Sequence, residues 1–209
     1  MEIKVLGFKG NIDSVSKTLD KINSLKNSDD EIIQLLNADA IAGLRHVEHG
    51  VNQAFLAFRR HENLANDLSV EICLRCSAQR QISKAFEILG LKEGKMNLCA
   101  ILINCSDEIV DELSLMFDRD NNVLIADELK LMKIYDIDKN ELLEFAKKIA
   151  EIAKKNGMAI GSCAERIDLD EVGIEHNCCI DKALIENIIG CKLKVDKDKN
   201  QRQECGCVE

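Results

Sequence analysis

Residues 63–94 read NLANDLSVEICLRCSAQRQISKAFEILGLKEG, and this stretch decides how the chain is expected to fold. Asn66 and Asp67 are residue types that favour the N-terminal cap of a helix. The run at 68–76 that follows them is apolar on nearly every side, which predicts a buried helix. Glu71 and Arg75 lie four residues apart with the acid first, the order in which an ion pair stabilises a helix.

A second helix is predicted at 79–89, and Gly90 is a suitable residue to end it. Its apolar residues recur at the spacing of a single stripe, which we expect to pack on the core: Ile82, Ala85, Phe86 and Leu89. Ile88 lies off that stripe, on the side that carries Lys84. We therefore expect Ile88 to face solvent or a partner.

The remainder of residues 1–142 predicts an α/β fold, in which a small mixed sheet is covered by several helices. The run NLCAILIN at 97–104 is continuously apolar and is typical of a central strand buried on both faces. Further apolar patterns predict strands at 3–8, 32–36 and 123–125, and helices at 11–27, 39–60, 107–117 and 129–135.

Composition limits the class of protein. The chain has 209 residues, of which 46% are hydrophobic and 31% are charged, enough for one good core and a small second unit. It shows no secretory signal and no apolar run of membrane-spanning length, so we expect a soluble, cytoplasmic protein without a membrane partner. Residues 1–96 carry 13 basic and 13 acidic side chains, so the net charge of −9 falls on residues 97–209. A nucleic acid would have to bind a local patch on the first part.

The ten cysteines are expected to be reduced thiols or metal ligands, because an intracellular chain rarely builds a disulfide framework. Four of them lie inside apolar patterns and are interpreted as core residues: Cys73, Cys76, Cys99 and Cys105. Cys73 and Cys76 form a C-x-x-C on a helix with no second pair nearby, which argues against a metal site. His46 and His49 could present two metal nitrogens, but a structural role is the better interpretation.

Motif-level signals for catalysis are missing from the sequence. It contains no P-loop, no G-x-G-x-x-G and no nucleophile, base and acid set with the spacing of a known motif. Binding is therefore the better functional class, and the chain is expected not to be an enzyme.

The central stretch also carries a family resemblance. Together with Asn37-Ala38-Asp39, His46 and the run at 52–54, it resembles the kinase-binding CGI-type subunit of the KEOPS complex, which makes threonylcarbamoyladenosine in tRNA. The resemblance covers roughly residues 1–140. Its motif residues are Asn66, Asp67, Leu68, Ser69, Glu71, Ile72, Arg75, Ser77, Arg80, Gln81, Ile82 and Ala85, followed by Gly90.

This resemblance implies a non-catalytic, regulatory KEOPS subunit that binds the protein kinase of the complex and helps recruit tRNA. It implies partner-binding residues at Ile82, Lys84 and Ile88, RNA-binding residues at Arg75, Arg80 and Lys84, and no cofactor in the N-terminal domain (1–142). The residues alone leave another interpretation open. Arg75 could simply pair with Glu71, while Arg80 and Lys84 solvate a helix and Ile88 is an ordinary exposed aliphatic.

Residues 143–209 differ in character, with a predicted helix at 143–155 followed by a cysteine-rich segment. The runs GMAIGSCAE, CID and KDKNQRQECGC resemble part of an uncharacterised cysteine-rich domain family associated with radical-SAM proteins. The run that would hold a radical cluster does not follow, so radical chemistry is not expected.

Four thiols match that family's pattern: Cys163, Cys179, Cys205 and Cys207. Four thiolates can hold zinc or an iron–sulfur cluster, and a tail without metal is the other interpretation. A small thiol-rich metal or iron–sulfur binding protein is therefore the alternative function. Metal content measured alongside kinase capture would discriminate between the two.

Overall fold

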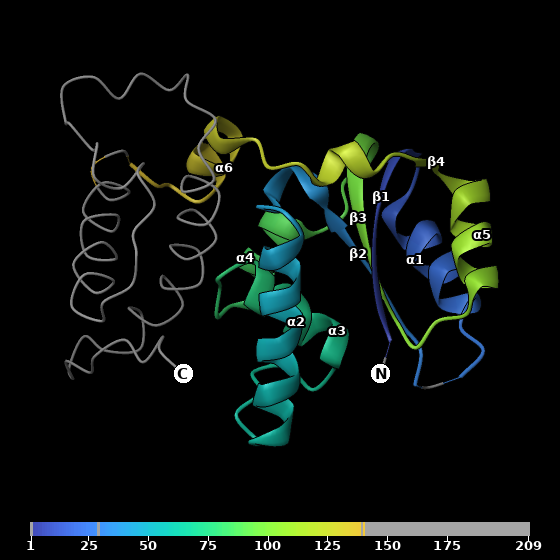
Figure 1. The fold of residues 1–209 in the computed structure, drawn as a ribbon, viewed down its shortest axis with the longest axis horizontal. Helices are drawn as coiled ribbons and strands as arrows, with labels where there is room; N and C mark the ends of the chain where they lie inside the picture. The colour runs from blue at the N-terminus through green and yellow to red at the C-terminus, as the bar shows by residue number, and fades with distance from the viewer. Residues whose placement is uncertain (1, 29, 139, 141–209) are drawn as a thin grey trace, which may run out of the picture. The chain divides into compact units, whose positions relative to one another are not determined.

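The structure of the protein is a computed structural model, and it describes residues 2–28, 30–138 and 140 (Figure 1). Four strands, six α-helices and two 3₁₀ turns follow one another along these residues. In chain order they are β1 (Ile3–Ile12), α1 (Val15–Ser24), β2 (Ile32–Asn37), η1 (Ala38–Ala40), α2 (Leu44–Arg59), α3 (Leu68–Cys76), α4 (Ile82–Leu89), β3 (Gly94–Ile103), α5 (Asp107–Met116), β4 (Asp118–Arg119), η2 (Asn121–Leu124) and α6 (Glu128–Ile134).

The sheet confirms the expected α/β class, with one difference in its pairing. Its strands lie in the order β2-β3-β1-β4, so β3 and β1 are central. Ile103 on β3 lies opposite both Ile3 and Ile32. All pairings among the described strands are antiparallel, whereas a mixed sheet was expected. Apolar periodicity identifies the strands but does not report their relative direction.

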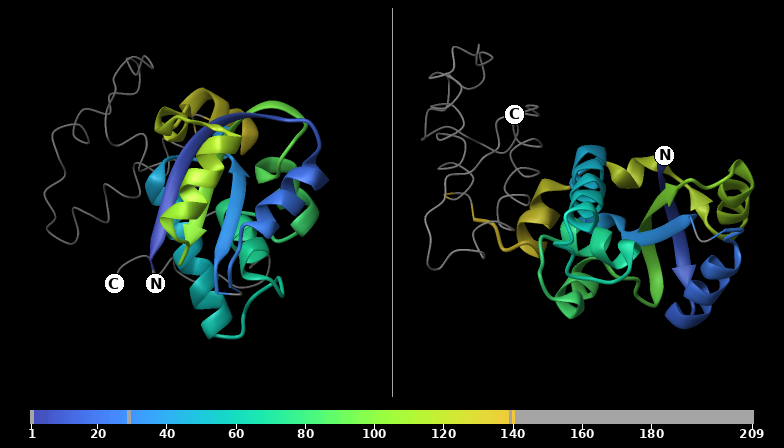
Figure 2. Two further views of the ribbon diagram at one scale, coloured as in Figure 1. Left: turned by 90° about the vertical axis from the view of Figure 1, so that its right-hand side faces the viewer. Right: turned by 90° about the horizontal axis from the view of Figure 1, so that it is seen from below.

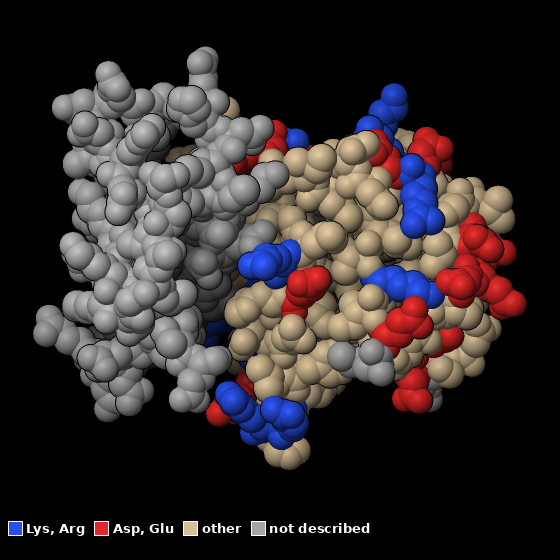
Figure 3. All heavy atoms as spheres, in the orientation of Figure 1, with Lys and Arg blue, Asp and Glu red and all other residues tan. Residues whose placement is uncertain are grey.

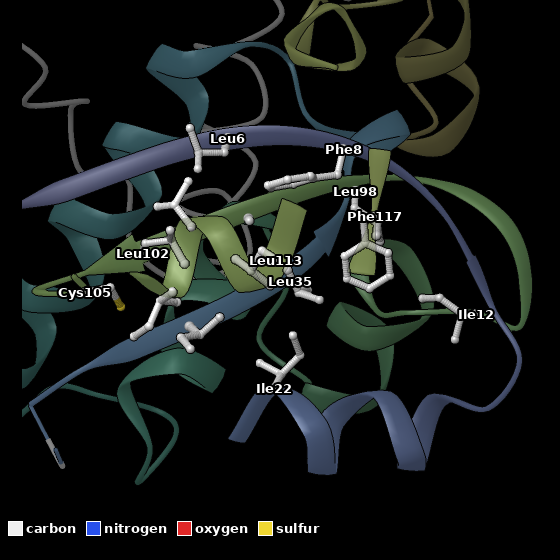
Figure 4. Close-up of a cluster of buried hydrophobic side chains, with 14 residues drawn as sticks. Leu6, Phe8, Ile12, Ile22, Leu35, Leu98, Leu102, Cys105, Leu113 and Phe117 are labelled. Atoms are coloured by element: carbon white, nitrogen blue, oxygen red, sulfur yellow. The ribbon is translucent and has the colours of Figure 1, made fainter. Parts of the chain in front are cut away.

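Helices cover both faces of the sheet, as the two turned views in Figure 2 show. Helices α1 and α5 cover one face, where the core gathers side chains from β1, β2 and β3 (Figure 4). The rings of Phe8 and Phe117 pack there with their centroids 6.4 Å apart. Leu98, Ala100 and Leu102 point to this face, and the alternating Cys99, Ile101 and Ile103 are equally buried. The prediction of a strand buried on both faces is confirmed.

Helices α2, α3 and α4 lie on the opposite side of the sheet (Figure 1). The approach of α2 to α3 depends on Gly50, because a Cβ at that position would overlap Sγ of Cys76 and lie 3.2 Å from its backbone nitrogen. The helices therefore come together at a point where only glycine fits without displacement.

The four described cysteines are buried, which confirms their interpretation as core residues. Burial raises the pKa of Cys73 and of Cys99 to about 12, and it also raises the pKa of Cys76 well above its ordinary value. Because the thiolate is the reactive and metal-binding form, these protonated thiols are unreactive at neutral pH.

Capping side chains determine where two of the helical elements begin. Helix α3 spans the predicted residues, and Oδ1 of Asp67 accepts hydrogen bonds from the backbone N–H groups of Ser69 and Val70 at its start. The strand predicted at 123–125 is wrong: a 3₁₀ turn ends at Leu124, and the Asp120 side chain caps its beginning by accepting from Asn122.

The contacts divide the chain into two units, residues 1–131 and 132–209. The boundary expected at residue 142 stays a prediction. Within the described part of the chain, none of the helices has the length and apolar character needed to cross a membrane.

Candidate partner and RNA interface

A buried carboxylate organises the start of the central stretch. The Glu71 side chain on α3 is fully buried, and its Oε2 accepts hydrogen bonds from the backbone N–H groups of Leu64 and Ala65 at 2.8 and 2.9 Å. Its Oε1 binds Arg75, whose Nε and Nη2 lie 2.7 and 2.6 Å away. Glu71 thus ties the loop before α3 to the helix, and this role of the acid was not predicted.

This geometry bears on Arg75 as an RNA-binding candidate. The Arg75 side chain is only 18% exposed, and two of its nitrogens are directed at Glu71. The predicted ion pair between the two residues is confirmed. Arg75 therefore has a structural role as the partner of Glu71. The RNA-binding role predicted for Arg75 stays a prediction.

Arg80 and Lys84 are both exposed, one just before α4 and the other in its first turn. Neither side chain forms an ion pair within residues 2–28, 30–138 and 140. Figure 3 shows basic side chains dispersed among acidic ones on the face it presents, with acidic groups gathered where α5 lies. Arg80 and Lys84 are thus able to contact phosphate without first breaking an ion pair.

The apolar stripe of α4 is only partly buried. Ala85 and Leu89 are buried as expected, but Ile82 and Phe86 are 43% and 42% exposed. The expectation that these two residues pack on the core is wrong. Ile88, expected to face outwards, is half-buried.

The physical reason is that periodicity says which side chains share a face, not how far a neighbouring element covers it. Helix α4 has only eight residues, and the core reaches one side of it. Phe86 is an exposed candidate for partner binding that the sequence pattern did not identify. The short length of the helix was the feature of the sequence that could have indicated its exposure.

His46 is held on both ring nitrogens. Its Nδ1 accepts from the backbone N–H of Ala42 at 3.0 Å, and its Nε2 donates to the carbonyl of Cys76 at 2.7 Å. Burial lowers the pKa of this imidazole to about 4. The structural interpretation of His46 is therefore supported, since neither nitrogen is available to a metal.

An open pocket of about 430 Å³ lies between the end of α1 and the start of α3, lined by Asn23, Lys26, Asn27, Ser28, Glu31 and Asp67. Within the described residues, His, Cys, Asp and Glu do not gather in threes with the geometry of a metal site. The predicted ligands Cys163, Cys179, Cys205 and Cys207 lie outside the described residues.

The fold and this surface define a small α/β protein with a candidate interaction face on one short helix. The chain belongs to the family described as domain of unknown function DUF1848, whose model matches residues 60–209. That match includes the cysteine-rich segment.

The chain is also similar to the regulatory protein Cgi121 of Methanocaldococcus jannaschii. The two are 43% identical over 75 residues, which is 36% of this chain and 46% of that protein. The match thus spans less than half the length of this curated relative.

Proposed function

We propose that this protein is a non-catalytic KEOPS subunit that binds the protein kinase of the complex and helps recruit tRNA for threonylcarbamoyladenosine formation. Two lines support the proposal. One is the motif at residues 66–90, and the other is the similarity to a curated regulatory protein. Within that assignment, the exposed surface of α4 is the candidate kinase-binding site.

The observation that carries the proposal is the pair Ile82 and Phe86, which lie one turn apart on α4 and are each more than two fifths exposed. Single exposed apolar residues are common on soluble proteins. Two large ones adjacent on a helix form a patch that a partner can desolvate, and aromatic residues are frequent anchors of such interfaces. Lys84 lies between them in sequence and gives the patch a charged neighbour.

The proposed RNA contacts follow the same surface. Arg80 and Lys84 are exposed basic side chains close to the apolar pair in sequence, whereas all of the excess negative charge of the chain lies beyond residue 96. Lysine and arginine contacts to phosphate supply most of the affinity in sequence-independent binding. Arg75 contributes mainly by holding α3, since its guanidinium is paired with Glu71.

The test is calorimetric titration of the full chain with the purified KEOPS kinase. The double variant Ile82→Glu, Phe86→Glu should weaken binding by roughly thirtyfold or more, the effect typical of losing an interface anchor. The matched control is Leu115→Glu on α5, since Leu115 is 82% exposed and lies on a helix that covers the other face of the sheet. The control should bind as the parent chain does.

Equal affinity of the parent and the double variant would contradict the assignment of α4 as the kinase site. Lack of any binding by the parent chain would contradict the proposed function itself. Circular dichroism of each variant reports whether the fold is retained, which is expected because both replaced residues are exposed.

A further inference from the structure

The turn Asn37-Ala38-Asp39 connects three parts of the fold through its side chains. Nδ2 of Asn37 donates to the backbone carbonyl of Ile88 on α4, at 3.3 Å. Oδ1 of Asp39 accepts from Nδ2 of Asn97 on β3 at 2.9 Å and pairs with Nζ of Lys130 on α6 at 3.1 Å. Oδ1 of Asn37 closes the turn by accepting from the backbone N–H of Asp39.

The bond to Ile88 satisfies a group that α4 cannot satisfy by itself. The last four carbonyls of a helix have no intrahelical donor. In α4 the carbonyl of Phe86 accepts from the N–H of Gly90, and the carbonyl of Ile88 accepts from Asn37. The C-terminal end of the helix is thereby fastened to the end of β2.

This fastening matters because α4 has few other anchors. It has eight residues, and only Ala85 and Leu89 among them are buried side chains. A side-chain hydrogen bond at one end adds a directional constraint that two apolar contacts do not supply. The turn itself cannot easily shift, since Asp39 is held from β3 and from α6.

We propose that Asn37 is a positioning residue that sets the orientation of α4, and with it the face formed by Ile82 and Phe86. The inference rests on the proposed function for the identity of the partner, but its structural part can be measured without one. Asn37 acts through the Ile88 carbonyl and does not touch the partner.

The test uses Asn37→Asp, which keeps the acceptor that closes the turn and removes the donor to Ile88. The matched control is Gln34→Glu on the same strand, because the amide of Gln34 donates to the adjacent carbonyl of Leu35 and, among the described residues, to no other element. Amide chemical shifts in a ¹H–¹⁵N spectrum of the full chain should change along α4 in Asn37→Asp and stay largely unchanged along β3. The control should leave both unchanged.

Kinase affinity is the second readout. Asn37→Asp should weaken it about fivefold, as loss of one ordering hydrogen bond would, with a correspondingly small fall in the denaturant midpoint. Unchanged chemical shifts along α4 would overturn the inference, whether or not the kinase binds. Equally large shift changes along α4 and β3 would also overturn it, because the substitution would then disturb the domain as a whole. Loss of binding in the Ile82 and Phe86 variant but not in Asn37→Asp would leave the proposed function standing and remove the positioning role.

Discussion

The guanidinium of Arg75 is bound to a carboxylate that has no contact with solvent, since the Glu71 side chain is fully buried and its Oε1 lies 2.6 Å from Nη2. Breaking a buried pair by removing one partner leaves an uncompensated charge. We expect Arg75→Ala to lower the free energy of unfolding by about 3 kcal/mol. Urea unfolding of the variant measures the loss.

Arg80→Ala is the matched comparison for this prediction, because Arg80 is exposed. It should change stability by no more than about 0.5 kcal/mol. Equal stabilities of the two variants would show that the Glu71 pair contributes nothing to the fold.

The proposed RNA interface predicts a change in the salt dependence of tRNA binding. Neutralising Arg80 and Lys84 together should weaken tRNA binding and reduce the slope of log affinity against log salt by about one per true phosphate contact. The measurement is fluorescence anisotropy with labelled tRNA across a range of salt concentrations. Arg45→Gln on α2 serves as the exposed control. A slope that stays the same in the double variant would exclude these two residues as phosphate contacts.

His46 predicts that stability depends on pH in a defined window. Burial lowers its pKa from the ordinary value of 6.5 to about 4, so between these values the unfolded chain binds a proton that the folded chain does not. Stability from this group is complete above pH 6.5 and is lost as the pH falls towards 4. The loss is about 3 kcal/mol.

Denaturant unfolding at a series of pH values between 4 and 7 measures this effect. His46→Gln should flatten the profile in that window, even if it is less stable overall. Asp67, whose carboxyl pKa is lowered by hydrogen bonds from Ser69 and Val70, is present in both proteins, so its own pH dependence cancels in the comparison. A parent profile that is already flat between pH 4 and 6.5 would contradict the prediction.

The close approach of α2 to α3 predicts an unusual response to alanine. Gly50→Ala should destabilise the domain by about 1–3 kcal/mol, because the new Cβ overlaps Sγ of Cys76. Alanine would otherwise favour a helix by about 1 kcal/mol over glycine. Cys76→Ala combined with Gly50→Ala should recover part of the loss, since the Sγ atom is then gone. Additive effects in this double-mutant cycle would show that the two residues are not in contact.

The cysteine-rich segment carries the remaining prediction. If Cys163, Cys179, Cys205 and Cys207 bind zinc or an iron–sulfur cluster, anaerobically purified protein should contain stoichiometric metal. Changing Cys205 and Cys207 to Ser should abolish it. Chelation should increase protease cleavage within 143–209 while residues 1–131 stay intact. Metal-free protein from an anaerobic preparation would exclude the site.

The sequence was most informative where local chemistry decides the outcome. The start of α3 follows from the Asp67 cap, and the double-sided burial of β3 follows from the uninterrupted apolar run at 97–104. The ion pair of Glu71 and Arg75 follows from helical spacing alone. These features depend on residues close together in the chain.

Features that depend on distant residues could not be predicted in the same way. Glu71 is buried because two N–H groups from an irregular loop turn towards it, and nothing in its helix indicates that. Phe86 is exposed because the core reaches only one side of α4. The bond from Asn37 to Ile88 joins positions whose proximity is set by the tertiary fold.

The register of the two central strands has a consequence for how the chain reaches this structure. Ile3 pairs with Ile103 and Lys9 with Asn97, so the middle of the sheet joins segments that are far apart in sequence. Closing so long a loop costs entropy before any contact compensates for it, and topologies of this kind fold slowly. During synthesis the apolar residues of β1 cannot pair with β3 until β3 has left the ribosome. Helices α2 and α3, which are close in sequence, are able to associate well before that moment.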